Sequence, residues 1–320
     1  MINSILQKIL PLARTIKYGR LLRRAQSDAK TMHAPELNPP ISFIFGCGRS
    51  GTTILGKLLA AHDEVLYLFE PYHIWRAVVP ATDMIQLYGS YESGTHCLMG
   101  DEFITETEVQ KFKACIQGEL KRSGNPQLSV IEKTPINAMR ISMLNAISPH
   151  SPMLHLVRNG IDVVRSIERL SSTNTYQISG KGDWNQWWGR DNCKWKALAA
   201  DATANGMFSD EIQMLNTDVQ KGALEWLVSL KEVNAHKEKL GDALLQVCYN
   251  NLTQNPREQI TAISNHFGIN PKDSWLEYCC EQLDFPRKNQ GDVVALPQQM
   301  CKAFNEFQEQ YGFEGRAVLM

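Results

Sequence analysis

The sequence predicts an α/β fold in which a parallel sheet is flanked by helices on both faces and followed by a helical C-terminal part. The main observation is an alternation of short apolar runs, typical of buried strands, with longer stretches of helical periodicity. Parallel strands need long crossover connections, and these are usually helices. The five apolar runs predict strands at Ile41–Phe45, Val65–Phe69, Leu128–Ile131, Met153–Val157 and Leu244–Tyr249.

Helices are expected between and after these strands, where apolar residues recur at a spacing of three or four residues. Those of the sheet region are expected at Thr52–Ala61, Asn137–Ile147, Ile161–Leu170 and Gln220–Leu240. Those of the C-terminal part are expected at Pro256–Phe267, Lys272–Leu283 and Pro297–Tyr311.

The composition limits the class of protein. The chain has 320 residues, of which 43% are hydrophobic and 21% are charged, which excludes a disordered chain, a collagen-like repeat and a small disulfide scaffold. It has no run of 18 or more apolar residues, so no transmembrane helix is predicted. The eight cysteines are scattered without a CxxC pair, so we expect reduced thiols and a cytoplasmic location, not a zinc site.

The charge distribution separates a leader from the body of the chain. The net charge of −1 is the sum of +6 over residues 1–33 and −7 over the rest, and an acidic body argues against nucleic-acid binding. We therefore expect a basic amphipathic leader and linker at 1–40, helical and kinked near Pro11, before a single α/β domain at 41–320. The leader is either solvated or self-packed, or it lies peripherally on an anionic membrane surface.

Polar residues lie at the end of each of the five predicted strands or just after it. They are the glycine-containing segment Gly46–Thr53, Glu70, Lys133, Arg158 and Tyr249. Because ligands of open parallel sheets bind outside the carboxyl ends of the strands, these residues are expected to form one site.

The segment after the first strand has the features of a phosphate-binding loop. Glycines at positions 46 and 51 allow backbone N–H groups to surround an anion at the start of a helix. A nucleotide-hydrolysing loop would have lysine where this chain has Thr52, so Arg49 supplies the positive charge instead. The residues expected to hold the phosphate end of a nucleotide are Gly48, Arg49, Ser50, Gly51, Thr52 and Thr53.

These residues resemble those of sulfotransferases that use 3′-phosphoadenosine 5′-phosphosulfate (PAPS) as donor. The pattern GxxRSGTTxL resembles their 5′-phosphosulfate loop, which implies a P-loop-type fold. Arg158 and Ser166, eight residues apart, resemble the pair that binds the 3′-phosphate in that family. The resemblance also implies that Tyr249 lies near the adenine and that Arg287 and Lys288 cap the 3′-phosphate.

The resemblance extends to the residues expected to act on the acceptor. The segment Val65–Trp75 is similar to carbohydrate 6-O-sulfotransferases and, together with the four residues before it, to tyrosylprotein sulfotransferases, which implies that Glu70 is the general base. Glu132 is the rival base, and the adjacent Lys133 is implied to face the transferring group. Pro135 stands where the aryl and steroid branch has a catalytic histidine, which argues against small phenols.

The predicted function is sulfuryl transfer from PAPS to a hydroxyl group of a glycan or glycolipid, without a required metal. The first alternative is a small-molecule kinase in which Thr53 and Glu70 hold Mg²⁺, and the second is a non-catalytic nucleotide-binding module. A tryptophan-rich insertion at about 171–218 provides either a platform for sugar rings or ordinary packing.

Overall fold

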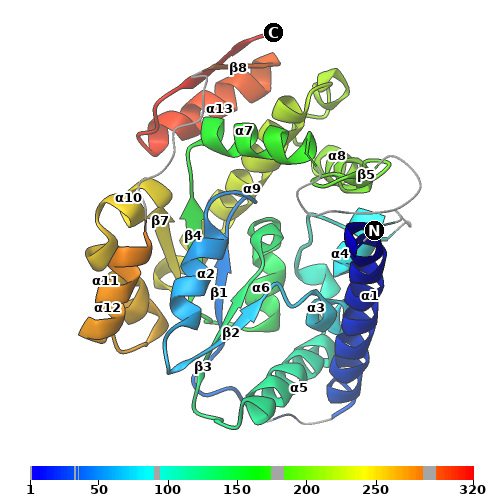
Figure 1. The fold of residues 1–320 in the computed structure, drawn as a ribbon. Helices are drawn as coiled ribbons and strands as arrows, with labels where there is room; N and C mark the ends of the chain where they lie inside the picture. Colours follow the sequence, from blue (N-terminus) through cyan, green and yellow to red (C-terminus); the bar gives the residue numbers. More distant parts are fainter. Residues whose placement is uncertain (1, 32–33, 35, 90–93, 174–183, 284–292) are drawn as a thin grey trace.

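The computed structural model describes residues 2–31, 34, 36–89, 94–173, 184–283 and 293–320, with backbone alone for residues 2–13. Its centre is a five-stranded parallel sheet with the order β2-β3-β1-β4-β7 (Figure 1). The predicted fold class is confirmed. In chain order the strands of this sheet are β1 (Ser42–Phe45), β2 (Val65–Phe69), β3 (Ser129–Lys133), β4 (Met153–Val157) and β7 (Leu244–Cys248).

Helices cover both faces of the sheet because neighbouring residues of a strand point to opposite sides. Ile44 belongs to the hydrophobic cluster on one face, whereas Phe43 and Phe45 belong to the cluster on the other. The helices on the Ile44 face are α2 (Thr52–Ala60), α10 (Tyr249–Gln254), α11 (Pro256–Phe267) and α12 (Asp273–Gln282). Those on the opposite face are α3 (Tyr72–Val78), α5 (Glu106–Ser123) and α6 (Ile141–Ile147).

A third hydrophobic cluster joins five further helices, and part of it lies beyond the carboxyl ends of the strands (Figure 1). Its helices are α4 (Met84–Gly89), α7 (Gly160–Ser171), α8 (Cys193–Ala204), α9 (Asp218–Leu240) and α13 (Gln298–Gln310). Two small sheets, which the sequence did not predict, also lie here: β5 (Trp184–Asn185) with β6 (Gly189–Arg190), and β8 (Val293–Leu296) with β9 (Arg316–Leu319). Short 3₁₀ segments are η1 (Pro80–Thr82), η2 (Asp101–Phe103), η3 (Pro135–Met139), η4 (Ile212–Met214) and η5 (Gly241–Ala243).

One predicted helix is divided in the structure. The stretch expected to be helical at 137–147 is η3 followed by α6, with a break at Arg140. The guanidinium group of Arg140 is fully buried and donates hydrogen bonds to the carbonyl groups of His96 and Cys97, at 2.7 and 3.2 Å. The break therefore allows the buried guanidinium group of Arg140 to bond to two carbonyl groups of another segment.

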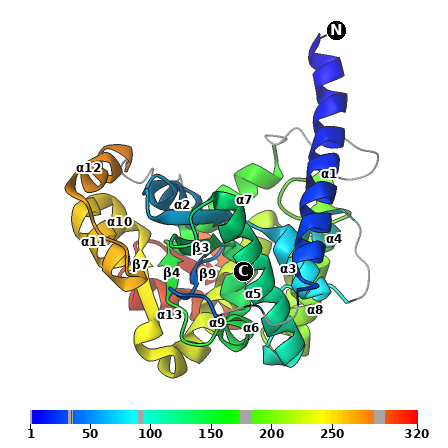
Figure 2. The same cartoon turned by 90° about the horizontal axis from the view of Figure 1, so that it is seen from below.

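The leader forms a single helix, α1 (Ile2–Asp28), which continues through Pro11 without the expected kink. Its second half packs against α3 and α5, with Ala25 buried and an Arg24–Glu119 ion pair at 2.8 Å. Its first half projects beyond the body of the molecule (Figure 2). No helix among the described residues is both long and apolar enough to cross a bilayer. The division of the chain at residue 40 stays a prediction.

Candidate active site

The carboxyl ends of the strands lie at one edge of the sheet, and the predicted site residues follow them. The register places Ile44 of β1 and Phe69 of β2 on either side of Lys133, the last residue of β3. Arg158 directly follows β4, and Tyr249 directly follows β7. Parallel pairing therefore brings together residues that are far apart in the sequence.

The loop between β1 and α2 depends on two of its glycines. Gly51 has a φ of 97°, and a Cβ atom there would lie 2.4 Å from the ring of Tyr249. A Cβ atom at Gly48 would lie 2.3 Å from the ring of Trp187. The helix α2 then begins at Thr52, so the free N–H groups of its first turn face this loop. Such a helix N-terminus is a suitable site for a phosphate or sulfate group.

Arginine side chains connect the loop with β4 and α7. The Nε atom of Arg49 donates to the Oγ atom of Ser166 at 3.1 Å, and Arg158 donates to the carbonyl oxygen of Arg49 at 3.3 Å. The guanidinium group of Arg158 also lies 4.9 Å from the ring centroid of Tyr249 and pairs with Asp162 at 3.2 Å. The Nε atom of Arg158 is buried and has no hydrogen-bond partner among the described residues. This unsatisfied donor fits an arginine that binds an anion.

On the other side of the loop, Lys133 connects the first turn of α2 with Glu70. Its Nζ atom lies 2.6 Å from Oε1 of Glu70 and 3.4 Å from Oγ1 of Thr53. The second oxygen of Glu70 accepts a hydrogen bond from the Tyr72 hydroxyl at 2.7 Å. A carboxylate, an ammonium group and the helix N-terminus thus lie within one continuous set of contacts.

The surroundings of Lys133 reduce its affinity for a proton. Its side chain is fully buried and lies 4.0 Å from the ring centroid of Phe69, whose own exposure is 55%. Burial lowers the pKa of Lys133, and the nearby Glu70 carboxylate opposes this effect. Lys133 is thus a buried lysine that pairs with Glu70. It is not a surface lysine paired with the adjacent Glu132.

Glu132 lies on the opposite face of β3 and has a different environment. Its fully buried carboxylate accepts hydrogen bonds from Trp75 at 3.0 Å, from Asn137 at 3.2 Å and from the Thr134 hydroxyl. Burial raises the pKa of Glu132 to about 7, although these donors act in the other direction. These contacts are typical of a core carboxyl group.

The tryptophan-rich stretch packs closely against the site. The indole nitrogen of Trp187 donates to Glu225 at 2.7 Å, and that of Trp188 donates to Asp218 at 2.8 Å. Trp188 is fully buried and meets Trp195 edge to face, with ring centroids 5.9 Å apart. For Trp187 and Trp188 these contacts favour packing over a platform for sugars.

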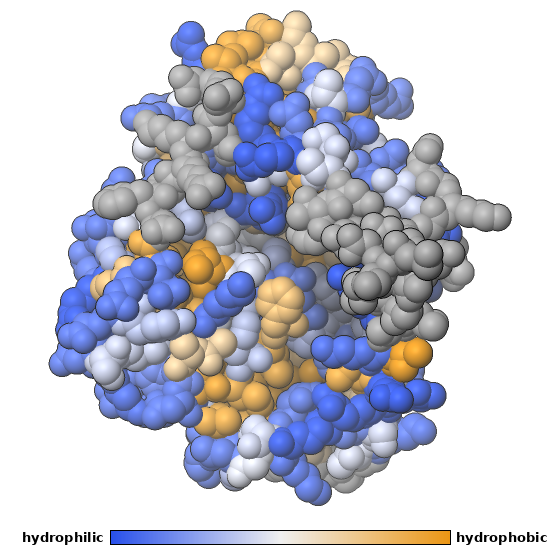
Figure 3. Space-filling model, viewed as in Figure 1, coloured by the Kyte–Doolittle hydropathy of each residue, from blue (hydrophilic) through white to orange (hydrophobic). Residues whose placement is uncertain are grey.

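The predicted residues that the structure describes thus form a connected series along the edge of the sheet. Figure 3 shows this face of the molecule hollowed near its centre, where hydrophilic and hydrophobic residues meet. Arg287 and Lys288 lie outside the described residues. The sequence reasoning did not identify Phe69 and Tyr72 as site residues, although Tyr72 stands only two positions after Glu70. It considered Trp187 only as part of the tryptophan-rich insertion.

Comparison with known proteins gives the family. A model described as the sulfotransferase family matches residues 40–273, which is well over half of the chain. The chain belongs to the sulfotransferase family. The prediction that it is an enzyme of sulfuryl transfer is thereby confirmed, while the carbohydrate branch of the family remains untested. A search of curated proteins found no match to this sulfotransferase.

Solved structures of other sulfotransferases are similar to this chain. The sulfotransferase domain of the olefin synthase from Synechococcus PCC 7002 is 20% identical, covers 89% of this chain and 99% of its own, and has a TM-score of 0.50. The sulfotransferase domain from the curacin biosynthetic pathway is 15% identical. The match covers 86% of this chain and 98% of that domain, with a TM-score of 0.49. Mouse sulfotransferase SULT7A1, complexed with PAP, is 13% identical. The match covers 83% of this chain and 69% of the mouse protein, with a TM-score of 0.39.

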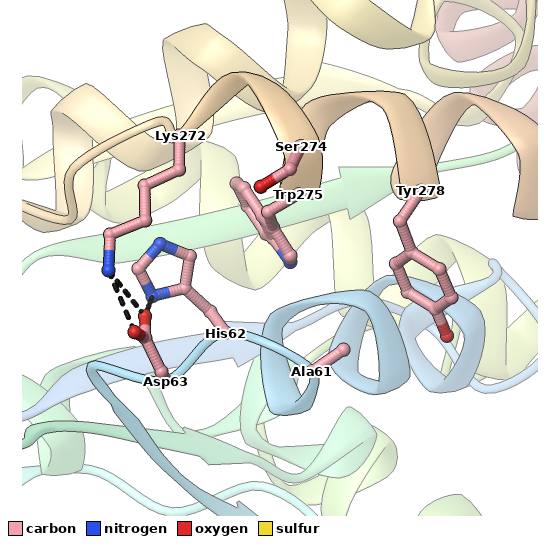
Figure 4. Close-up of a pocket in the computed structure, with 7 residues that line it drawn as sticks. All are labelled: Ala61, His62, Asp63, Lys272, Ser274, Trp275 and Tyr278. Carbon is pink, nitrogen blue, oxygen red and sulfur yellow. Dashed lines mark hydrogen bonds and ion pairs between the residues drawn. The ribbon is translucent and has the colours of Figure 1, made fainter.

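A cavity of about 520 Å³ lies away from these contacts, beside the amino end of β2 (Figure 4). Lys272 pairs there with Asp63 at 2.7 Å, and the cavity is also lined by Trp275 and Tyr278 of α12. Because ligands of parallel sheets bind at the carboxyl ends of the strands, we do not include this cavity in the active site.

Proposed function

We propose that this sulfotransferase moves a sulfuryl group from PAPS to a hydroxyl group of a carbohydrate or glycoconjugate. The observation that carries the proposal is the bridge made by Lys133, which contacts Thr53 at the phosphate loop and Glu70 at the end of β2. A donor phosphate at the loop and an acceptor at Glu70 would meet beside this lysine.

The donor half of the proposal uses the loop and the two arginines. The N–H groups of the loop and of the first turn of α2 would hold the sulfated 5′ end. Arg158 and Ser166 would bind the 3′-phosphate, for which the unpartnered Nε atom of Arg158 is available. Tyr249 would lie against the adenine, and the contribution of Arg287 and Lys288 stays a prediction.

The acceptor half of the proposal uses Glu70 and Lys133. Sulfuryl transfer resembles phosphoryl transfer, in which positioning and charge stabilisation provide most of the catalysis. Lys133 would stabilise the negative charge that develops on the departing phosphate oxygen. Glu70 would accept the proton of the attacking hydroxyl. Its side chain is 22% exposed, whereas Glu132 is fully buried and already accepts three hydrogen bonds.

The proposed acceptor class rests on the resemblance of the segment around Glu70 and on one surface feature. Phe69, directly before Glu70, exposes more than half of its surface. An exposed ring beside the base offers a face against which a sugar ring can stack.

A transfer assay tests this proposal. The wild-type protein is incubated with PAPS that carries radiolabelled sulfate, together with a panel of glycans, glycolipids and phenols. The label is expected in a glycan or glycolipid. Glu70→Gln is expected to lower turnover by about 10²–10⁴-fold, the usual contribution of a general base, with unchanged binding of 3′,5′-bisphosphoadenosine. Turnover near the wild-type value in this variant would contradict the role of Glu70.

The alternatives make different predictions in the same experiment. A kinase would require Mg²⁺ and would bind ATP in preference to 3′,5′-bisphosphoadenosine. The direct pairing of Glu70 with Lys133 disfavours it, since a metal-binding carboxylate would then have to leave a buried cation. A non-catalytic module would bind the nucleotide but transfer no label to any acceptor.

For the leader we propose peripheral contact with an anionic membrane surface. The first half of its helix projects from the body, and Lys17, Arg20 and Arg23 are exposed on the half that packs against α3 and α5. Each basic residue near such a surface contributes roughly 1 kcal/mol. The protein should therefore sediment with vesicles that contain phosphatidylserine and remain in solution with phosphatidylcholine alone. Replacement of these three residues by glutamine should abolish the difference, and equal sedimentation with both vesicles would refute the contact.

A further inference from the structure

The contacts of Tyr72 give this residue a role that rests on the proposed function of Glu70. Its hydroxyl donates to Oε2 of Glu70 at 2.7 Å, while Lys133 lies 2.6 Å from Oε1. Each oxygen of the carboxylate thus has one donor and keeps a further lone pair for another hydrogen bond. The two donors come from different elements, α3 and β3, so together they fix the plane of the carboxylate.

A tight turn of the backbone brings Tyr72 back toward Glu70. The N–H group of Tyr72 donates to the carbonyl oxygen of Glu70 at 2.7 Å. Between them, Pro71 has φ −76° and ψ 59°, the values of an inverse γ-turn. Glu70 has a φ of 42°, in the left-handed region where residues other than glycine are strained. The sequence Glu-Pro-Tyr therefore forms a tight turn that places the tyrosine hydroxyl beside the carboxylate of Glu70.

Tyr72 is suited to act as a permanent neutral donor. Burial, followed by the charge of Glu70, raises the pKa of Tyr72 well above its usual value. The phenol therefore keeps its proton throughout the pH range in which enzymes of this kind work. It stabilises the ionised carboxylate without bringing a second positive charge beside Lys133.

We propose that Tyr72 is the positioning residue of the general base. With Lys133 alone, the carboxylate of Glu70 could turn about its last bond, because only one oxygen would be held. The hydrogen bond from Tyr72 prevents this rotation and keeps the carboxylate directed toward the acceptor hydroxyl. Geometry of this kind matters because misplacement by about 1 Å can cost about 10²-fold in rate.

The first test compares Tyr72→Phe with a matched control, Tyr67→Phe. Tyr67 lies on β2, three residues before Glu70, and its buried hydroxyl has no hydrogen-bond partner among the described residues. With the acceptor that the wild-type protein modifies, Tyr72→Phe is expected to lower kcat by about 10–100-fold, the usual value of a hydrogen bond to a charged group. The KM for PAPS and the kcat of Tyr67→Phe should stay unchanged. Equal kcat values for the two variants would overturn the proposal.

A double variant tests whether Tyr72 acts through Glu70. If it does, Tyr72→Phe should change turnover little when Glu70 is already glutamine, because the base that it positions is absent. The same loss in both backgrounds would show that Tyr72 acts in another way.

A titration that needs no acceptor separates this proposal from the proposed function. The side-chain carboxyl groups of glutamate are labelled with carbon-13, and the Glu70 resonance is assigned from its absence in Glu70→Gln. Loss of a hydrogen bond to the charged form disfavours that form, so Glu70 should titrate at a higher pH in Tyr72→Phe than in the wild-type protein or Tyr67→Phe. An unchanged titration would overturn the role of Tyr72 even if transfer is observed. If no acceptor is modified, the proposed function fails, and the titration still decides whether Tyr72 controls Glu70.

Discussion

Two lysine–glutamate pairs in this sulfotransferase have similar geometry. The Nζ atom of Lys133 lies 2.6 Å from Glu70, and that of Lys194 lies 2.8 Å from Glu225. Both lysine side chains are almost completely buried, and both ammonium groups lie over an aromatic ring at about 4 Å from its centroid. Geometry alone would not tell which pair takes part in catalysis.

The partners of the two glutamates distinguish the pairs. Glu225 is 5% exposed, binds Lys194 through both oxygens and also accepts the indole N–H of Trp187. Glu70 is 22% exposed and meets its lysine through one oxygen only. Burial acts against the charge of both lysines, yet the close Glu225 raises the pKa of Lys194, whereas the pKa of Lys133 is lowered.

The difference indicates which pair stabilises the fold and which is available for chemistry. A buried pair with all its contacts satisfied cannot exchange partners without leaving an uncompensated charge. A pair that borders the phosphate loop through Thr53, with a carboxylate partly open to water, can do so. The following experiments test this division, from the largest expected effect to the smallest.

The largest effect on turnover among the lysines is expected for Lys133→Met. Loss of one group that stabilises developing charge typically costs about 10²–10³-fold in kcat. The free energy of unfolding should change little, because Glu70 remains partly exposed to water. Transfer kinetics and urea unfolding measure the two effects. Lys272→Met, which breaks the exposed pair with Asp63 beside the remote cavity, is the control and should leave kcat unchanged.

Lys194→Met is expected to affect stability more than any other substitution considered. It leaves Glu225 buried without its counter-ion, which typically costs about 3–5 kcal/mol of unfolding free energy. Urea unfolding of the variant provides the measurement. The double variant Lys194→Met with Glu225→Gln should regain most of the loss, since no unpaired charge remains. A single variant as stable as the wild-type protein would remove the distinction between the two pairs.

Gly48→Ala tests how the buried pair supports the phosphate loop. The new methyl group would meet the ring of Trp187, which Glu225 holds in place by a hydrogen bond. Overpacking of this kind costs about 1–3 kcal/mol, so the Kd for 3′,5′-bisphosphoadenosine is expected to rise by about 10–100-fold. Calorimetric titration measures it. In the Trp187→Leu background the same substitution should cost much less, and an equal loss in both backgrounds would show that Trp187 is not the cause.

Much of the fold was predictable because the central strands are continuous apolar runs. The strands at 65–69 and 153–157 have the predicted bounds. The helix α5 was not predicted, although Thr105 and Glu108 form a capping box at its start. Its exposed face is strongly charged, which weakens the apolar periodicity. The break at Arg140 was not predictable, because its cause is a contact with a distant segment.

The site was predictable to the extent that it follows strand ends. Parallel pairing alone brings Glu70, Lys133 and Arg158 to one edge, so their positions in the sequence were sufficient. The contact of Trp187 with Gly48 depends on how α8 and α9 pack, which no local pattern indicates. The position of Tyr72 was predictable only in part. The sequence shows the proline before it, but not the conformation of the turn that brings its hydroxyl to Glu70.

The smallest effect on turnover is expected for Glu132→Gln. Glu132 lies on the face of β3 opposite Lys133 and adds a fully buried carboxyl group to the comparison. Burial raises the pKa of Glu132 from 4.5 to about 7. Between these two pH values the carboxyl group is protonated in the folded state and ionised in the unfolded state. Its contribution to stability is therefore complete below about pH 4.5 and is lost as the pH rises through about 7. The variant should show a smaller fall in unfolding free energy over this range, because glutamine does not titrate.

The Oδ1 atom of Asn137, which has no partner among the described residues, can accept a hydrogen bond from the amide group of glutamine at position 132. Turnover should stay at the wild-type level, and a loss as large as that of Glu70→Gln would make Glu132 the base instead.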